Sequence, residues 1–211
     1  LLDDAPGIAS NLVSYINGFS PRARDIFEKF EFENEIQKLD ENNRLFLIIK
    51  EFCSPQIDLS PERLSPMDMG YVFEELVRKF NEQANEEAGD HFTPREVIRL
   101  MVSLMFSDED EVFQAGIYKS IYDPAVGTGG MLSESEKHIK AQNPDANLEL
   151  FGQEYNPEAY AICCSDLLIK DAPINNLIFG DTLGLKGAKN RANNYVPHDG
   201  HGDKQFHYML A

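Results

Sequence analysis

The chain has 211 residues, of which 42% are hydrophobic, and it carries 36 Asp and Glu against 19 Lys and Arg, for a formal net charge of -17. This length and apolar share predict one large domain or two small ones, with a core that needs neither disulfides nor metals. The acidic balance argues against a free-standing nucleic-acid clamp, because such binding depends on Lys and Arg that displace counterions from phosphates. If DNA is a substrate, we expect another segment or subunit to make most of the contacts with its phosphates.

The cysteines and histidines indicate neither a disulfide framework nor a metal site. The cysteines are odd in number and form no Cys-x-x-Cys pair, and Cys163 and Cys164 are direct neighbours in a helical pattern. We therefore expect structural thiols in a reducing cytoplasm. His198, His201 and His207 follow no standard ligand spacing, so no metal site is predicted there.

The sequence carries no signal for a membrane. Its start, Leu1-Leu2-Asp3-Asp4, has no basic leader and no Met. No apolar run approaches the ~18 residues that a membrane-spanning helix needs. We expect a cytoplasmic fragment that begins inside a longer protein.

Residues 1–90 have a helical pattern throughout. Residues 22–32 and 44–52 carry apolar side chains at helical spacing. Ser65-Pro66-Met67-Asp68 is typical of a helix start, with Ser65 as the N-cap. The helix after it has an apolar stripe, typical of core or subunit packing, made of Met69, Val72, Phe73, Leu76, Val77 and Phe80.

Residues 91–211 alternate between helix and strand. The elements expected in chain order are a helix over residues 94–106, a strand over 119–122, a helix over 130–141, a strand over 147–152, a helix over 156–169, and strands over 177–179 and 205–210. A long polar loop, residues 184–203, precedes the last strand. This alternation predicts an α/β fold with a parallel sheet, helices on both of its faces, and ligands beyond the carboxyl ends of its strands.

A glycine-rich turn follows the first predicted strand, in the run Asp123-Pro124-Ala125-Val126-Gly127-Thr128-Gly129-Gly130-Met131. Glycine lets the backbone turn tightly and approach a ligand before the next helix begins. The turn is not a Walker P-loop, because no Gly-Lys-Ser/Thr follows. Asp123 would repel a pyrophosphate, but it suits a cationic or hydrogen-donating group such as the amino acid end of S-adenosylmethionine. The alternative is an ordinary turn that needs glycine for positive φ.

Acidic residues also follow the next two predicted strands. Glu154 ends the second, where a carboxylate can accept hydrogen bonds from ribose hydroxyls. Asp181 follows the third, where it could accept from an exocyclic amino group of a base. Each residue alone fits a solvated strand end or a turn cap equally well. Three strands in succession that end in this way favour a nucleoside-containing ligand.

A helix start precedes the glycine-rich turn in the sequence. Thr93-Pro94-Arg95-Glu96 has the pattern of a capping box, with Thr93 as N-cap and Glu96 reaching back to it. Such a box is an ordinary structural device. A helix start also presents free N–H groups and a partial positive charge, which suit a carboxylate.

Four segments together carry a family resemblance: HFTPREV, DPAVGTGGM, FGQEYNPEAYAI and GDTL, in that order. As a set they closely resemble the methyltransferase (modification) subunit of type I restriction-modification systems, which belongs to the adenine-N6 DNA methyltransferases. The resemblance covers roughly residues 66–183. It implies a Rossmann-like S-adenosylmethionine-dependent methyltransferase domain over residues 91–211, incomplete at its C-terminus, behind an all-α region over 1–90. It also implies contact with DNA mainly through a specificity subunit, and a restriction subunit in the same complex.

The resemblance implies a role for each cofactor-binding residue. Thr93 would lie near the methionine carboxylate and Asp123 beside the methionine moiety, while Glu154 would hold the ribose hydroxyls. Tyr155 would lie against the adenine ring and Asp181 would meet its amino group. The complete expected set is His91, Phe92, Thr93, Pro94, Arg95, Asp123, Ala125, Gly127, Thr128, Gly129, Gly130, Glu154, Tyr155, Asp181 and Leu183.

The family's catalytic tetrapeptide, Asn/Asp-Pro-Pro-Phe/Tyr, does not occur in the sequence, which contains no Pro-Pro pair. In the family this motif holds a flipped target adenine. We expect it just after Ala211, and we expect these 211 residues alone to bind cofactor without transferring a methyl group. Two other interpretations stay open: a methyltransferase that acts on RNA or protein, and a non-catalytic assembly module.

Overall fold

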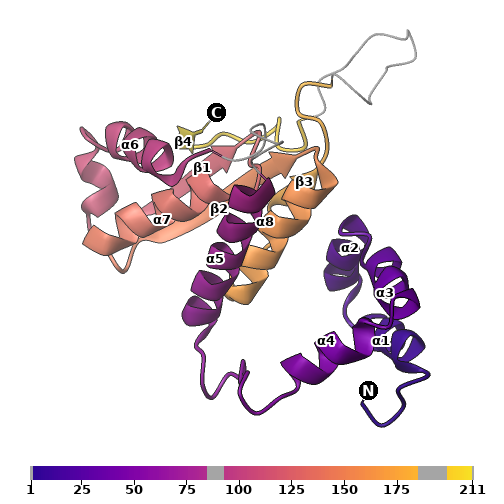
Figure 1. Cartoon of the computed structure of the whole chain (residues 1–211). Coiled ribbons are helices and arrows are strands. Elements are labelled where there is room, and N and C mark those ends of the chain that lie inside the picture. The colour runs from indigo at the N-terminus through magenta and orange to yellow at the C-terminus, as the bar shows by residue number, and fades with distance from the viewer. Residues whose placement is uncertain (1, 85–92, 185–198, 211) are drawn as a thin grey trace, which may run out of the picture.

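The computed structural model describes residues 2–84, 93–184 and 199–210, which form a group of N-terminal helices followed by an α/β unit (Figure 1). The helices before the sheet are α1 (Ile8–Ile16), α2 (Pro21–Lys29), α3 (Phe32–Glu41), α4 (Leu45–Phe52) and α5 (Pro66–Ala84). The α/β unit consists of α6 (Arg95–Met105), the 3-10 helix η1 (Asp110–Phe113), β1 (Tyr118–Asp123), α7 (Gly130–Gln142), β2 (Asn147–Glu154), α8 (Pro157–Ile169), β3 (Leu177–Phe179) and β4 (Tyr208–Met209).

The four strands form one parallel sheet in the order β3-β2-β1-β4. In its register Asp123 lies opposite Gly152, and Glu154 lies opposite Phe179. The carboxyl ends of β1, β2 and β3 therefore meet at one edge. The predicted α/β fold and parallel sheet are confirmed.

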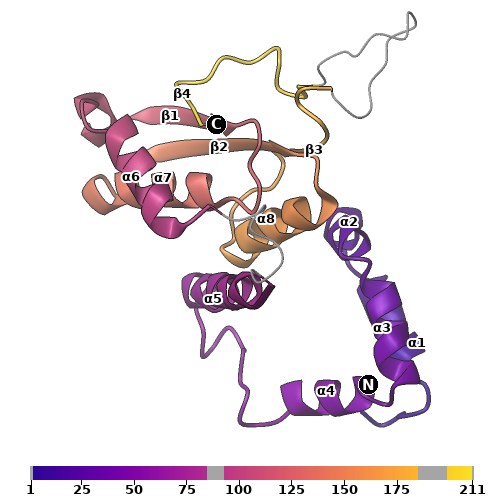
Figure 2. The same ribbon diagram turned by 45° about the horizontal axis from the view of Figure 1, so that its top comes forward.

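The flanking helices α6, α7 and α8 lie on one face of the sheet, so among the described elements the expectation of helices on both faces is wrong (Figure 2). The strand order runs in one direction from β1 to β2 to β3, and right-handed crossovers then place α7 and α8 on the same side. The other face is covered by rings instead. Phe206 packs on Tyr122 and Phe151, with ring centroids 4.6 and 5.0 Å apart, and His201 packs on both as well.

Two of the predicted elements differ from the observed ones by more than two residues at one end. The predicted helix over residues 22–32 stops at Lys29, because Glu31 has φ 51 and turns the chain before α3 begins. The predicted last strand over 205–210 pairs only at Tyr208–Met209, because Phe206 turns onto the sheet face. The boundary expected near residue 90 falls in 85–92, and most of the loop 184–203 falls in 185–198; both segments lie outside the described residues.

The core has two parts. The larger lies between the sheet and α6–α8 and includes Ile121, Leu132 and Ala161, together with Ile26 from α2. The smaller joins α1, α3 and α4. Arg22 of α2 also donates a hydrogen bond to the carbonyl of Ile174 (2.6 Å), so the N-terminal helices dock directly on the α/β unit.

Helix α5 begins as expected and lies along α8 (Figure 1). The Ser65 Oγ accepts a hydrogen bond from the Asp68 N–H (3.2 Å), and an Asp68 carboxylate oxygen accepts from the Ser65 N–H (3.2 Å), so the two residues form a capping box. The predicted apolar stripe is only partly covered, because Val72 and Leu76 are 38% and 50% exposed. In the described ranges, no helix is long and apolar enough to cross a membrane.

Candidate functional site

Asp123 ends β1 with its side chain almost fully buried, at 3% exposure. One carboxylate oxygen accepts a hydrogen bond from the N–H of Ala125 (3.0 Å), which shapes the start of the turn. Burial raises the pKa of Asp123 to about 6, and nearby Glu154 adds to this against the opposing bond from Ala125. The position therefore carries an acceptor in a poorly hydrated site, where a donor or cation from a ligand would interact strongly.

Glu154, at the end of β2, holds the glycine-rich turn in place. Its two carboxylate oxygens accept hydrogen bonds from the N–H of Gly127 (2.8 Å) and from the N–H of Asn156 (2.7 Å). The predicted strand-end carboxylate therefore exists, and it has a structural task that the sequence did not indicate. Each carboxylate oxygen has a second lone pair, which leaves acceptor capacity for a ligand.

The loop after β3 meets the turn after β1. The Thr182 hydroxyl donates to the carbonyl of Pro124 (2.6 Å), and the Gly180 N–H donates to the carbonyl of Glu154 (2.9 Å). Asp181 accepts from the N–H of Leu183 (3.1 Å), which is the turn cap that the sequence left open as an alternative. These contacts bring together the three strand ends whose acidic residues the sequence singled out.

Three glycines of the turn have different surroundings. Gly127 (φ +55) has no atom within 4 Å of where a Cβ would stand, so this backbone faces open space. Gly129 (φ +89) lies against the Cys163 sulfur, 2.9 Å from an added Cβ, and Gly130 lies equally close to Ile98 of α6. The turn is thus open at Gly127 and packed against neighbouring side chains at Gly129 and Gly130.

Helix α6 starts one residue later than a capping box at Thr93 requires, so that expectation is wrong. Its N-cap is Pro94, whose ring provides no acceptor, and the helix begins at Arg95. The Pro94 carbonyl accepts from the N–H groups of Val97 and Ile98. Among the described residues, the N–H groups of Arg95 and Glu96 have no hydrogen-bond partner, so these two are available to a ligand. His91 and Phe92 lie outside the described residues.

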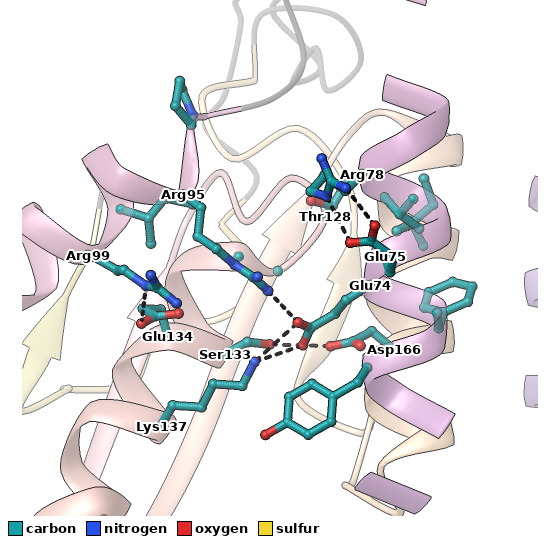
Figure 3. A pocket seen from close by; sticks show the side chains of 18 of the residues that line it. Glu74, Glu75, Arg78, Arg95, Arg99, Thr128, Ser133, Glu134, Lys137 and Asp166 are labelled. Atoms are coloured by element: carbon teal, nitrogen blue, oxygen red, sulfur yellow. Dashed lines mark hydrogen bonds and ion pairs between the residues drawn. The ribbon is translucent and has the colours of Figure 1, made fainter. Parts of the chain in front are cut away.

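A pocket of about 720 Å³ joins the α6 start to the glycine-rich turn (Figure 3). Pro94, Thr128, Gly129 and Gly130 line it together with side chains from α5, α7 and α8. The Arg95 guanidinium lies in this pocket on Glu74 of α5, at 2.6 Å. The carboxylates of the strand ends do not line it, so the expected residues fall into two adjacent groups rather than one cavity.

Exposed side chains flank the strand ends. Tyr155 is 51% exposed directly after β2, and Leu183 is 67% exposed after β3. Ala125 is also exposed. A ring and an aliphatic side chain in such positions offer apolar contact to a planar ligand at this edge.

A family model described as N-6 DNA Methylase matches residues 65–211. The chain belongs to the N-6 DNA methylase family. The matched region begins at the Ser65 cap of α5, so in this family member α5 is part of the matched unit along with the sheet and the strand-end residues.

Curated relatives of this family member are methylase subunits of type I restriction enzymes. The chain is 26% identical over 170 residues to the HindI methylase subunit of Haemophilus influenzae, which covers 73% of this chain and 36% of that protein. It is 35% identical over 78 residues to the EcoKI methylase subunit of Escherichia coli, or 37% of this chain and 13% of that one. The chain therefore spans well under half of the length of these relatives.

A solved structure shares the fold. It is the type I restriction-modification system methyltransferase subunit from Streptococcus thermophilus, with a TM-score of 0.63 at 22% identity, over 92% of this chain and 40% of that one. The likeness supports the Rossmann-like α/β arrangement. It includes most of the N-terminal helices as well as the sheet.

The sequence did not identify two contributors to this candidate site. Thr182 joins two strand-end loops, and its only signal was a hydroxyl next to Asp181. Glu74 lies between Phe73 and Val77 in the apolar stripe of α5. An acidic residue on an otherwise apolar helix face was the sequence feature that could have identified it. Of the histidines, His201 packs between rings and His207 bonds to Ser120, while His198 lies outside the described residues.

Proposed function

We propose that the chain binds S-adenosylmethionine at the carboxyl edge of its sheet and forms the cofactor-binding part of a DNA adenine-N6 methyltransferase subunit of a type I restriction-modification system. The observation that carries this is the bond from Gly127 to Glu154. This bond holds the glycine-rich turn, which has open space at Gly127, next to a second buried carboxylate, that of Asp123.

The residues fit the chemistry of this cofactor. Its amino acid end has an ammonium group, which suits Asp123, and a carboxylate, which suits the free N–H groups at the start of α6. Its ribose hydroxyls suit the remaining lone pairs of Glu154. Its adenine suits the exposed Tyr155 and Leu183, with Asp181 as acceptor for the amino group. When bound, the cofactor supplies an electrophilic methyl group on a sulfonium.

The residues of the chain bind and orient in this scheme. Asp123 and Glu154 hold polar groups at fixed positions, because both are buried and bonded to the turn. Gly127, Thr128, Gly129 and Gly130 form the turn against which the methionine moiety lies. The remaining expected contacts, which include His91, Phe92, Thr93 and Ala125, belong to the same proposal. We also keep residues 1–90 and 91–211 as the proposed division into a helical region and the first half of the methyltransferase domain.

DNA is the proposed acceptor, reached through a specificity subunit, with a restriction subunit in the assembly. The names of the curated relatives support a type I assembly. The net charge of -17 supports dependence on a partner subunit for contacts with the DNA phosphates. A cytoplasmic location is part of this proposal.

The sequence contains no Asn/Asp-Pro-Pro-Phe/Tyr motif. A protein made of these 211 residues should therefore bind the cofactor but transfer no methyl group, because no residue here is expected to hold the target amino group in line with the methyl carbon. Methyl transfer to DNA by that protein would contradict this part of the proposal.

Calorimetry with S-adenosylhomocysteine tests the cofactor site. We expect saturable binding by the unmodified protein and a loss of at least roughly tenfold in affinity for Asp123→Ala, since a buried charged partner is removed. Asp203→Ala, which changes an exposed residue at the end of the loop 184–203, is the matched control and should bind normally. No binding by the unmodified protein would favour the assembly-module interpretation.

The acceptor is tested separately. Tritiated S-adenosylmethionine, offered with DNA, RNA and protein to the protein with its native continuation and partner subunits, should label DNA alone. Label in RNA or protein would overturn the choice of DNA and leave the cofactor site standing.

A further inference from the structure

Glu74 of α5 contacts cationic side chains from three other helices. Its carboxylate accepts hydrogen bonds from Lys170, the C-cap residue of α8 (2.6 Å), from Lys137 of α7 (2.9 Å) and from Arg95 at the start of α6 (2.6 Å). Figure 3 shows the Arg95 and Lys137 side chains converging on it. One carboxylate thus links α5 to all three helices that cover the sheet.

The contact between Glu74 and Lys170 is largely buried, and Gly70 leaves room for it. The Glu74 side chain is 18% exposed and that of Lys170 is 10% exposed. Gly70, one turn earlier on α5, lies where a Cβ would stand 2.8 Å from Lys170 Cε, so the lysine stem runs along α5 in the space left by the glycine. A larger side chain at position 70 would displace the lysine.

The charges at Glu74 stabilise its ionised form. Burial acts to raise the pKa of Glu74, but the hydrogen bonds from Lys170 and Lys137 outweigh it and hold the pKa below its usual value. Burial acts to lower the pKa of Lys170, but its bonds to Asp166 and Glu74 hold that pKa above its usual value. Glu74 and Lys170 are therefore both ionised at neutral pH.

The same network reaches the proposed cofactor site from two sides. Arg95 is the first residue of α6, directly after Pro94, and its side chain is held by Glu74. In α7, Ser133 donates to Asp166 (3.3 Å), and Asp166 shares Lys170 with Glu74. The α6 start and the first turn of α7 both line the pocket described above.

We propose that Glu74 is a positioning residue for cofactor binding: by holding Arg95, Lys137 and Lys170 together, it fixes the start of α6 against the glycine-rich turn. The proposal rests on the cofactor site proposed above. It gives α5, a helix outside the sheet, a part in cofactor affinity. The docking of the N-terminal helices and the affinity for the methionine end are then coupled.

The first test is the affinity for S-adenosylhomocysteine, measured by calorimetry well below the melting temperature of each variant. Glu74→Gln should weaken binding roughly three- to thirtyfold, the range expected for residues that act on a site through a contact network. Glu136→Gln is the matched control. It removes one carboxylate that is paired within α7 alone, to Lys140 at 2.6 Å, and should bind as the unmodified protein does.

A double-mutant cycle separates positioning from direct contact. Arg95→Gln alone should weaken binding to a similar degree, and Glu74→Gln with Arg95→Gln should be no weaker than the weaker single variant. Additive losses would mean that Glu74 and Arg95 act on binding independently of one another, and they would overturn the role given to Glu74. A Glu74→Gln protein with a lowered melting temperature and unchanged affinity would also overturn it.

A second variant covers the case in which Glu74→Gln does not fold. Glu74→Asp keeps the charge that compensates the lysines but is shorter by one methylene, so it should fold and still bind severalfold more weakly; unchanged affinity would count against the proposal. If the unmodified protein binds no S-adenosylhomocysteine, the proposed function fails. If it binds and the Glu74 variants bind equally well, only the role of Glu74 fails.

Discussion

The N–H of Gly127 donates a hydrogen bond of 2.8 Å to the carboxylate of Glu154, and this bond joins the turn after β1 to the end of β2. The other oxygen of Glu154 accepts from the N–H of Asn156, the cap of α8. The Glu154 carboxylate therefore fixes both the turn after β1 and the start of the segment after β2.

Glu154→Gln should destabilise the fold and weaken cofactor binding. The amide has one acceptor oxygen, so one of the two N–H groups loses its partner, at a cost of about 1–3 kcal/mol in the free energy of unfolding. Urea unfolding measures this cost, and calorimetry with S-adenosylhomocysteine measures the affinity. Glu158→Gln, on an exposed residue of α8, should change the unfolding free energy by less than about 0.5 kcal/mol. Unfolding curves for Glu154→Gln that match those of the unmodified protein would count against the bond.

Gly127→Ala and Gly129→Ala should differ in stability. Both positions have positive φ, which costs an alanine roughly 1–2 kcal/mol. Gly127 has room for the methyl group, whereas at Gly129 it would meet the Cys163 sulfur at 2.9 Å. Gly129→Ala should therefore be the less stable variant in urea unfolding, and Cys163→Ala in the same protein should recover part of the difference. Equal stabilities would contradict this account of the turn.

Asp123→Asn should change the pH dependence of stability. Burial, with help from Glu154, raises the pKa of Asp123 in the folded protein to about 6, against about 4 in an unfolded chain. The folded state then holds this proton to higher pH, so Asp123 reduces the free energy of unfolding as pH rises from about 4 to about 6, by about 3 kcal/mol in total. Asn carries no such proton. The free energy of unfolding of Asp123→Asn, relative to that of the unmodified protein, should therefore grow over that interval. Urea unfolding of both proteins at several pH values measures this difference, and a difference that does not change with pH would refute the prediction.

Asn156→Ala should lower stability through the loss of the α8 cap. The Asn156 side chain accepts hydrogen bonds from the N–H groups of Glu158 and Ala159, both at 3.0 Å. Removal of such a cap costs about 1 kcal/mol, which a melting curve resolves. Asn156→Asp keeps the acceptor and should melt close to the unmodified protein. A large loss in both variants would point to a cause other than the cap.

Much of the α/β unit follows from local pattern. The predicted third strand, Leu177–Phe179, matches the observed one, and the helix predicted from residue 130 begins there. Strands and helices of this kind are set by apolar periodicity and by glycine and proline at their ends, which are local properties. The last strand was predicted too long because the turn of Phe206 onto Tyr122 is a long-range contact that periodicity does not contain.

The candidate site was also predictable only in part from the sequence. The sequence identified Asp123, Glu154 and the glycine-rich turn by residue type and by position after a strand. It could not show that Glu154 accepts from Gly127, because that bond depends on how two neighbouring strands are aligned. It misplaced the cap of α6 by one residue, since both Thr93 and Pro94 are plausible before Arg95.

The sequence by itself determined the family, the order of the elements and the strand ends at which acidic residues stand, because these depend on residue type and short spacing along the chain. Only the tertiary structure decided which charges meet. Glu74 and Lys170 are far apart in sequence and bond at 2.6 Å, because α5 packs along α8 with Gly70 at the contact. Such contacts depend on the packing of whole elements, and that packing is not encoded in any one segment.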